Sequence, residues 1–358
     1  MNAYVLHDIN DIRYEEVPVP TPKAGEVLVR VKACGICGSD IPRIYETGAH
    51  VHPLIPGHEF SGQVEALGEG VKEEWINKPV GIFPLIPCGE CGPCQRKQYE
   101  MCRHYNYLGS RCDGGFAEYV AVPERNLIEL PQGVSYEQAA MLEPMAVAVH
   151  AMRRAGIGCA DGVKLDELKE MRVCVYGLGT IGLLLTMFLT EAGAENLYVI
   201  GNKNSQKERA LALGVVETDF LDSRKNDVSS WIHAKTNGAG MDILFECIGK
   251  NETVSNAIDN TAPAGTTILV GNPHADMFLE KTVYWKILRN QLRVTGTWNS
   301  SFTHEETDDW HYVLDRLAKN RAKPEMLITH RFALAELETG LHIMRDKSED
   351  YVKIMCVF

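Results

Sequence analysis

The sequence lacks the features that would direct the protein to a membrane, a secretory pathway or nucleic acid. It contains no run of about 18 apolar residues, the length that a membrane-spanning helix needs. Its opening, MNAYVLHDINDIRYEEV, has no basic segment followed by an apolar core, so no secretory signal is expected. Positive charge is scarce, because 36 Lys and Arg face 48 Asp and Glu, a formal net charge of -12. This balance disfavours a nucleic-acid groove or a polybasic membrane patch. We therefore expect a cytoplasmic protein without nucleic-acid or membrane partners.

Internal repeats and low-complexity segments are also missing, and the length of 358 residues favours two domains or a large two-part fold. Residues 1–33 and 60–86 form short, strand-like stretches punctuated by Pro and Gly, which indicates a loop-rich β region. Residues 159–170 are polar and are expected to form a surface excursion. From residue 172 onward, strand and helix patterns alternate, which predicts a doubly wound parallel sheet and the fold class α/β.

Four of the eleven cysteines are closely spaced and predict a metal site. Cys88, Cys91, Cys94 and Cys102 follow the pattern C-x2-C-x2-C-x7-C. Short loops with Gly and Pro can bring four sulfurs into a tetrahedron around zinc with no ligand position open, which describes a structural site. An iron–sulfur cluster or two disulfides are the alternatives, but the last spacing does not suit the common ferredoxin patterns. Six further cysteines have no ligand spacing and are expected to be small packing residues: Cys34, Cys112, Cys159, Cys174, Cys247 and Cys356.

A second candidate metal site lies in the segment CGICGSDIPRIYETGAHVHPLIPGHEFSG, residues 34–62. Cys37, His58 and Glu59 offer a thiolate, an imidazole and a carboxylate, which together suit zinc. Ser39 could relay a proton from a metal-bound alcohol, and the carboxylate of Asp40 could orient the His ligand. The simpler interpretation is a buried Cys beside a hydrogen-bonded His.

Glu143 is a further candidate ligand. Residues 135–155 place apolar residues at helical spacing, and Glu143 interrupts them. An acid in an apolar helical run is costly unless it is paired or coordinated. An exposed carboxylate at a helix end is the alternative.

A glycine-rich segment between a strand and a helix predicts a dinucleotide-binding turn. The segment consists of Gly177, Leu178, Gly179, Thr180, Ile181 and Gly182. The first glycine makes the turn, the second lets the backbone approach a pyrophosphate, and the third lets helix and strand pack closely. The pyrophosphate would rest on the helix N-terminus. A Gly-rich turn without a ligand is the alternative.

The end of the next strand bears on the choice of cofactor. NAD-preferring proteins of this type place an Asp or Glu there to bind the ribose hydroxyls. Here Gly201, Asn202 and Lys203 occupy that place, which removes the repulsion of a 2′-phosphate and adds a cation that can pair with it. We therefore predict NADP(H) as the preferred cofactor and NAD(H) as the alternative. In the simpler interpretation, Gly201 is a turn and Lys203 a solvated surface residue.

Taken together, these segments resemble the zinc-dependent medium-chain alcohol and polyol dehydrogenases over nearly the whole chain. The segments that carry the resemblance are CGICGSDIPRIYETGAH, PGHEFSG, the four-Cys lobe, YLGSRCDGGFAEY, EPMAVAVHA, GLGTIG and KILRNQLRVTGTW. The stretches SDIPRIYETGAH and LGSRCDGGFAEY are most similar to members that act on polyol phosphates.

The resemblance implies a GroES-like catalytic domain formed by residues 1–149 and 298–358, and a Rossmann domain formed by residues 150–297. It implies a catalytic zinc on Cys37 and His58, with Glu59 or a nearby water and with Glu143 as a further ligand. Ser39 holds the proton-relay position. Pro42 stands where liver-type alcohol dehydrogenases continue the relay with a His, so the outer proton path must differ.

The implied reaction is the interconversion of a polyol phosphate, such as galactitol 1-phosphate, and the ketose phosphate by hydride transfer. Basic residues at Arg43, Lys286 and Arg289 are expected near the substrate, although ordinary surface charge would explain each of them. Sorbitol, arabitol phosphate and ribitol phosphate remain alternative substrates. A zinc-binding interaction module and a quinone-reductase-like protein without catalytic zinc are weaker alternatives. A homodimer or homotetramer is expected, because residues 292–298 form an apolar edge strand.

Overall fold

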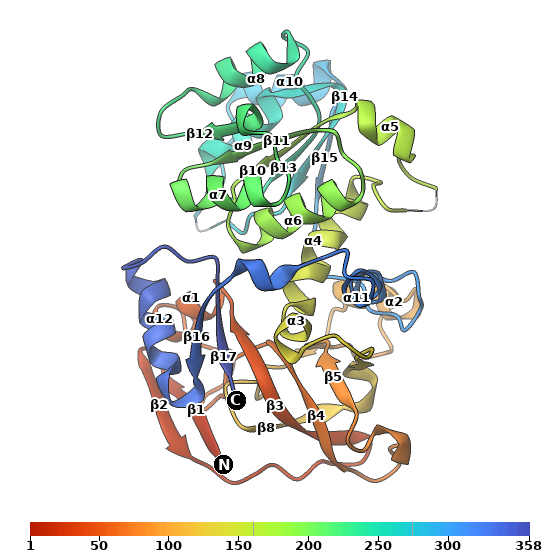
Figure 1. Ribbon diagram of the computed structural model, residues 1–358, viewed down its shortest axis with the longest axis vertical. Helices are drawn as coiled ribbons and strands as arrows, with labels where there is room; N and C mark the ends of the chain where they lie inside the picture. The colour runs from red at the N-terminus through yellow and green to blue at the C-terminus, as the bar shows by residue number, and fades with distance from the viewer. Residues whose placement is uncertain (160, 274) are drawn as a thin grey trace. The chain divides into compact units, whose positions relative to one another are not determined.

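The computed structural model describes residues 1–159, 161–273 and 275–358 and divides into two compact units. The first unit comprises Met1–Ala146 and Ser300–Phe358, and the second comprises Val147–Asn299. The first is therefore built from both ends of the chain, and Figure 1 shows the N- and C-termini in it. The candidate metal ligands fall in the first unit and the glycine-rich turn in the second.

A seven-stranded sheet forms the centre of the first unit, with the order β16-β17-β3-β4-β5-β9 and with β8 paired to β3. The strands are β3 (Glu26–Ile36), β4 (Glu59–Leu67), β5 (Pro79–Ile82), β8 (Tyr119–Pro123), β9 (Leu127–Glu129), β16 (Ile328–Ala333) and β17 (Lys353–Val357). Figure 1 shows β3, β4 and β5 side by side. Strand β17 pairs antiparallel with β3, so the last strand of the chain lies beside the segment that leads to Cys37.

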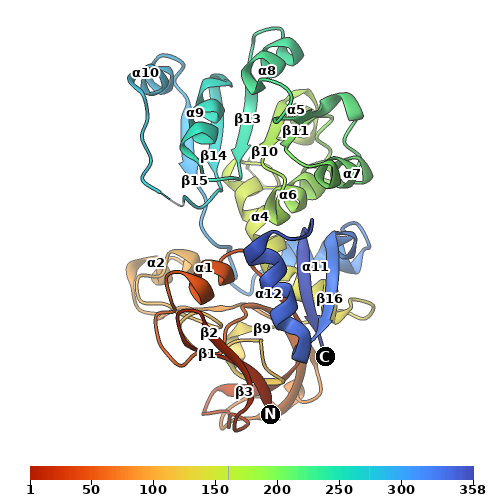
Figure 2. The ribbon, with the colours of Figure 1, turned by 90° about the vertical axis from the view of Figure 1, so that its left-hand side faces the viewer.

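Shorter elements surround this sheet. They are β1 (Asn2–Asp8), β2 (Asp11–Glu16), α1 (Asp40–Tyr45), β6 (Leu85–Ile86), α2 (Gly92–Gln95), β7 (Asn106–Tyr107), α3 (Tyr136–Ala140), α11 (Asp309–Ala318) and α12 (Leu337–Asp346). Helix α4 (Leu142–Arg154) begins in this unit, and its residues from Val147 onward belong to the second. Helix α12 lies against β16 and β17 (Figure 2). The strand-like pattern predicted for residues 1–33 is confirmed in β3, where Val27, Val29 and Val31 are buried and Arg30 is exposed. Buried side chains from β1, β3, β4, β17 and α12 form one core.

The second unit is a six-stranded parallel sheet with the order β12-β11-β10-β13-β14-β15, which confirms the predicted doubly wound fold. Its strands are β10 (Arg172–Tyr176), β11 (Asn196–Gly201), β12 (Phe220–Asp222), β13 (Met241–Glu246), β14 (Thr261–Leu269) and β15 (Arg293–Gly296). Its helices are α5 (Leu165–Glu170), α6 (Thr180–Glu191), α7 (Asn204–Ala212), α8 (Val228–Thr236), α9 (Asn251–Asp259) and α10 (Lys281–Arg289). Helices α6 and α7 lie on one face, and α9 and α10 on the other (Figure 2). The strand order reverses between β10 and β13, and parallel sheets bind ligands at the carboxyl ends of such strands.

Two short helices were not predicted from the sequence. Residues 161–170 contain α5 where a polar surface excursion was predicted, while Ala160 lies outside the described residues. Leu168 alone is buried in α5, so its apolar pattern is too weak to indicate a helix. Helix α1 spans only six residues and lies between the two strand-like regions, in a stretch for which no element was predicted. In the described parts of the chain, no helix is long and apolar enough to cross a membrane.

Candidate metal and cofactor sites

The register of two strands brings Cys37 and His58 together. Strand β3 pairs with β4 so that Gly35 lies opposite Glu59. Cys37 follows the end of β3 and His58 precedes the start of β4, so both leave the sheet at the same edge. Residues that are about twenty positions apart in the sequence therefore become neighbours through strand pairing.

The candidate ligand atoms of Cys37, His58 and Glu59 all lie within 4.8 Å of one another. Ligands at about 2.0–2.3 Å from a tetrahedral zinc are separated by about 3.5 Å, so small shifts would suffice to hold an ion. The Nδ1 atom of His58 is buried without a hydrogen-bond partner in the described structure. A buried imidazole beside a thiol and a carboxylate offers a donor set that suits a zinc site.

Asp40 connects the backbone of this site to His58. Its buried carboxylate accepts a hydrogen bond of 2.9 Å from the Cys37 N–H and one of 2.5 Å from Arg43 Nη1. Its Oδ1 also lies 3.4 Å from His58 Nδ1, close enough for an ionic contact. Burial raises the pKa of Asp40, but the charges of His58 and Arg43 outweigh it and keep the pKa below its ordinary value. The carboxylate is therefore placed to fix the orientation of the imidazole.

Ser39 and Glu143 are the two other predicted residues of this site. The exposed hydroxyl of Ser39 donates a hydrogen bond of 3.4 Å to Cys37 Sγ. Glu143 is buried on α4 and accepts a hydrogen bond of 3.2 Å from the Tyr107 hydroxyl. The pKa of Glu143 is raised to about 7, because burial outweighs the opposing effect of the charge of His58. Glu143 is not one of the residues whose ligand atoms lie within 4.8 Å of one another.

Lys353 is a residue of this site that the sequence analysis missed. Its ammonium group is buried on β17 and forms a short hydrogen-bonded ion pair with Glu59 Oε2. It also donates a hydrogen bond of 3.1 Å to the Ile36 carbonyl. An ideal Cβ at Gly35 would lie 2.3 Å from Glu59 Oε2, so the carboxylate occupies space that only glycine leaves open. Lys353 and Glu59 are 294 positions apart, and no local pattern could have linked them.

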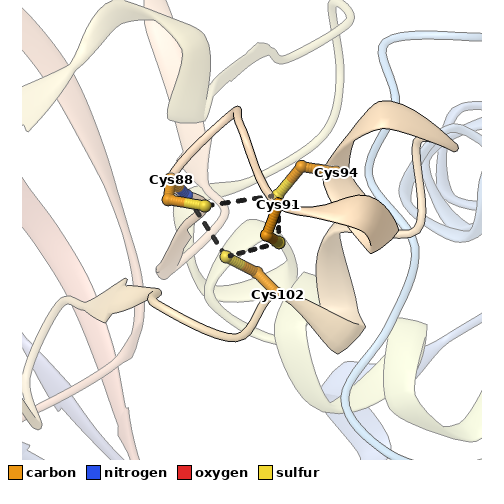
Figure 3. A group of neighbouring side chains, drawn as sticks. All are labelled: Cys88, Cys91, Cys94 and Cys102. Atoms are coloured by element: carbon orange, nitrogen blue, oxygen red, sulfur yellow. Dashed lines mark hydrogen bonds between the residues drawn. The ribbon is translucent and has the colours of Figure 1, made fainter.

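The four clustered cysteines converge as a separate group. Figure 3 shows the sulfurs of Cys88, Cys91, Cys94 and Cys102 turned toward a common centre. The Cys91–Cys94 sulfurs are 3.4 Å apart, and the Cys88–Cys94 and Cys91–Cys102 sulfurs are 3.9 Å apart. All four are free thiols rather than disulfides. Backbone N–H groups of Arg103 and Cys94 lower the pKa of Cys91 to about 6, which favours the thiolate that zinc binds. Four sulfur ligands with no other donor fit a closed zinc site.

In the second unit, the glycines of the turn after β10 differ in their surroundings. Gly177 has a φ of +104°, which favours glycine. A Cβ at Gly182 would lie 1.9 Å from the Gly177 carbonyl oxygen, so helix and turn pack too closely for any side chain. A Cβ at Gly179 would meet nothing within 4 Å, and Gly179 caps the N-terminus of α6, which starts with Thr180 and Ile181. These surroundings match the three roles that a dinucleotide-binding turn requires.

Glu246, a buried carboxylate at the end of β13, is a second residue that the sequence analysis missed. Glu246 ends β13 and accepts hydrogen bonds from the N–H groups of Ile248 and Gly249, both at 2.9 Å. It also accepts one of 2.7 Å from the Thr253 hydroxyl. Ile248 in turn lies against Gly177, where a Cβ would be 2.4 Å from its side chain. Glu246 therefore fixes the loop that borders the glycine-rich turn.

The remaining predicted cofactor residues lie where β11 passes into α7. Gly201 is the last residue of β11, and Lys203 precedes the first residue of α7. The Asn202 N–H donates a hydrogen bond of 2.8 Å to the side chain of Gln206. The three predicted residues thus stand at the carboxyl edge of the sheet, where parallel strands bind ligands.

The three basic residues expected near the substrate do not share one location. Arg43 lies beside the candidate metal site through Asp40. Lys286 instead pairs with Asp259 at 3.1 Å, next to the amino end of β14, and Arg289 stacks on Trp285. Lys286 therefore stands at the edge of the sheet opposite the glycine-rich turn, and only Arg43 adjoins a candidate catalytic group.

Comparison with known proteins assigns both units. Residues 23–132 match the family model of the alcohol dehydrogenase GroES-like domain, and residues 180–319 match that of the zinc-binding dehydrogenases. The chain is 33% identical over 329 residues to galactitol 1-phosphate 5-dehydrogenase of Escherichia coli K12, covering 91% of this chain and 92% of that protein. It is 30% identical over 354 residues to sorbitol dehydrogenase of Halalkalibacterium halodurans, covering 98% and 96%.

Solved structures agree with the sequence relatives. Galactitol-1-phosphate dehydrogenase of Escherichia coli superposes with a TM-score of 0.90 at 30% identity and covers 100% of both chains. A zinc-binding dehydrogenase of Sinorhizobium meliloti 1021 bound to NADP has a TM-score of 0.87 at 27% identity, with coverage of 100% and 99%. An alcohol dehydrogenase of Escherichia coli CFT073 complexed with NADH has a TM-score of 0.88 at 26% identity, also with coverage of 100% and 99%.

Proposed function

This chain belongs to the zinc-dependent medium-chain dehydrogenase family, and we propose that it interconverts a polyol phosphate and its ketose phosphate using NADP(H). The observation that carries the proposal is the convergence of Cys37, His58 and Glu59 beside the hydroxyl of Ser39. A mixed set of sulfur, nitrogen and oxygen donors leaves a coordination position for substrate, whereas the four-Cys group does not. Oxidoreductase chemistry is the established activity of the family, and the substrate and cofactor are the finer parts of this proposal.

In the proposed mechanism, the residues of the first unit hold the substrate and move its proton. A zinc ion bound there would supply a Lewis acid that lowers the pKa of a secondary hydroxyl, and a bound nicotinamide cofactor would supply the hydride acceptor. Cys37 and His58 would hold the metal, with Glu59 or Glu143 completing the ligand set. Ser39 accepts the hydroxyl proton. Because Ser39 is exposed and Pro42 offers no imidazole to continue a relay, the proton passes from Ser39 to water.

A cationic group beside the metal site supports a phosphorylated substrate. Arg43 reaches the site through Asp40. Burial and then the charges of Arg111 and Arg43 lower the pKa of His50. In a chain with a net charge of -12, the charges of these two arginines favour an anionic substrate group. The relative that acts on galactitol 1-phosphate supports the same interpretation.

The test measures kcat/KM for galactitol 1-phosphate, galactitol, sorbitol, arabitol phosphate and ribitol phosphate, with and without a zinc chelator. We expect turnover that zinc removal abolishes, and a preference for the phosphorylated polyols. Arg111→Ala should lower kcat/KM for a phosphorylated polyol about tenfold or more and leave that for the free polyol nearly unchanged. Equal or higher efficiency on the free polyols would contradict the phosphate assignment and would favour a sorbitol-type dehydrogenase, as the second relative suggests.

The preference for NADP(H) is tested at Gly201. Gly201→Asp restores the acid that repels a 2′-phosphate, and its Cβ would meet the flexible end of Gln206 at 2.8 Å. Gly201→Ala is the matched control, because it adds the same Cβ without the charge. We expect Gly201→Asp to shift the ratio of kcat/KM toward NAD by at least about tenfold, which is about 1.4 kcal/mol. A tenfold preference of the unchanged protein for NAD would refute this part of the proposal.

A further inference from the structure

The loop after β12 adjoins the predicted site of the adenosine ribose. Strand β12 pairs with β11 so that Asp222 lies opposite Gly201. Ser223 then donates a hydrogen bond of 2.9 Å from its N–H to the Gly201 carbonyl. Arg224 follows, and its Nη2 donates a hydrogen bond of 3.3 Å to the Asn204 side chain at the start of α7. The guanidinium therefore reaches across from β12 to the segment that contains Asn202 and Lys203.

Asp222 and Arg224 form a charge pair in this loop. Arg224 Nε and Nη2 donate hydrogen bonds of 2.9 and 2.7 Å to the two carboxylate oxygens of Asp222. The guanidinium side chain is 49% exposed, whereas that of Asp222 is 13% exposed. These hydrogen bonds from Arg224 lower the pKa of the Asp222 carboxyl far below its usual value. The acid opposite Gly201 is thus neutralised from within its own loop, with the cation on the solvent side.

We propose that Arg224, together with Lys203, binds the 2′-phosphate of NADP(H) and sets the cofactor preference. A guanidinium carries five N–H donors, so it can hold Asp222 and a phosphate oxygen at the same time. Because Arg224 also contacts Asn204, its charge stands next to the backbone of residues 201–204, where the 2′-position of the ribose is expected. The inference rests on the proposed use of NADP(H) and names a specificity-determining residue for it.

The role of Arg224 can be measured without turnover, using calorimetric titration with 2′,5′-ADP and 5′-AMP, which differ only in the 2′-phosphate. We expect the unchanged protein to bind 2′,5′-ADP more tightly. Arg224→Gln should weaken 2′,5′-ADP binding by about tenfold to hundredfold, as expected for a lost charged hydrogen bond, and change 5′-AMP binding by less than about twofold. The affinity of Arg224→Lys for 2′,5′-ADP should lie between that of the unchanged protein and that of Arg224→Gln, because lysine keeps the charge but loses the fork geometry.

Arg13→Gln is a closely matched control. Arg13 pairs with Asp11, also two positions away, through Nε and Nη2 at 2.7 and 2.6 Å, but it lies in the first unit. This variant should leave both ligands unaffected. The inference is overturned if Arg224→Gln changes neither ligand, or changes both equally. If the unchanged protein shows no zinc-dependent turnover, the proposed function is refuted instead. Failure of the inference and failure of the proposed function are therefore distinguishable.

Asp222→Asn separates this inference from a competing role of Asp222 as the acid that binds the ribose hydroxyls. If Arg224 binds the 2′-phosphate, removing the negative charge should keep or strengthen 2′,5′-ADP binding and leave 5′-AMP unchanged. If Asp222 binds the ribose, the same change should weaken 5′-AMP binding by about tenfold. The second outcome would overturn the inference and assign the protein to NAD(H).

Discussion

At the scale of single residues, substitutions of Cys37 and Cys94 should have different consequences, because the two thiols belong to different candidate metal sites. We expect about two zinc ions per chain, one in the open set of Cys37, His58 and Glu59 and one in the closed four-Cys set. Cys37→Ala should abolish turnover and leave the protein folded, because its site needs only to hold a catalytic ion. Cys94→Ala should lower the thermal midpoint, because its zinc holds a loop-rich lobe together.

Metal analysis, kcat and thermal unfolding measure these outcomes together. Cys159→Ala is the control, since Cys159 is exposed and belongs to neither group. A fully active Cys37→Ala protein would contradict the assignment of the catalytic metal site.

The buried pair of Lys353 and Glu59 predicts a strong dependence of stability on Lys353. Both side chains are almost inaccessible to solvent, with exposures of 2% and 1%. Lys353→Met removes one partner and leaves a buried charge beside the candidate ligands, which costs about 3–5 kcal/mol. Combining Lys353→Met with Glu59→Gln removes both charges and should recover most of that loss. Denaturant unfolding followed by tryptophan fluorescence, to which the buried Trp310 contributes, measures the difference. Equal stability of the single and double variants would contradict a coupled pair.

At the scale of elements, the turn between β10 and α6 predicts that substituting one of its glycines lowers stability and substituting another weakens cofactor binding. Gly182→Ala places a Cβ 1.9 Å from a backbone carbonyl oxygen, so it should lower the thermal midpoint of the second unit. Gly179→Ala meets no protein atom within 4 Å, and its φ of -72° is allowed for alanine. This variant should keep its stability but bind 5′-AMP-containing cofactors at least about tenfold more weakly, because the added methyl occupies the place of the pyrophosphate.

Thermal unfolding and cofactor titration of both glycine variants measure these effects. Unchanged cofactor affinity in a well-folded Gly179→Ala protein would show that the pyrophosphate does not approach Gly179.

At the scale of the whole molecule, the edge of the parallel sheet predicts a homodimer. Strand β15 stands at one end of the strand order, and edge strands present backbone groups that can pair with another chain. Trp298 follows β15 and is 60% exposed, and Leu288 on α10 is 58% exposed. Apolar side chains at an open sheet edge favour a symmetric pairing of two copies.

Sedimentation at micromolar concentration should therefore show a species larger than the 39.9 kDa monomer. Trp298→Lys should shift the protein toward monomer, whereas Leu165→Lys, at a similar exposure of 55% on α5, should not. A monomer alone at that concentration would defeat the prediction.

Local patterns in the sequence determined the parts of this protein that depend on neighbouring residues. The G-x-G-x-x-G segment and the alternation of strands and helices after residue 172 predicted the doubly wound sheet, because turn, strand and helix signals act over short distances. The spacing of Cys88, Cys91, Cys94 and Cys102 likewise confined four sulfurs to one loop-rich segment before any tertiary contact was considered.

Tertiary structure decided what depends on strand pairing and burial. The β3–β4 register brought Glu59 to Cys37, and the return of β17 placed Lys353 on Glu59 across 294 positions. The β11–β12 register set Arg224 beside the site that Gly201 had left without an acid. Charges that are distant in sequence acquire partners only when the chain closes on itself, because sequence periodicity records which face is buried and not which residues meet across it.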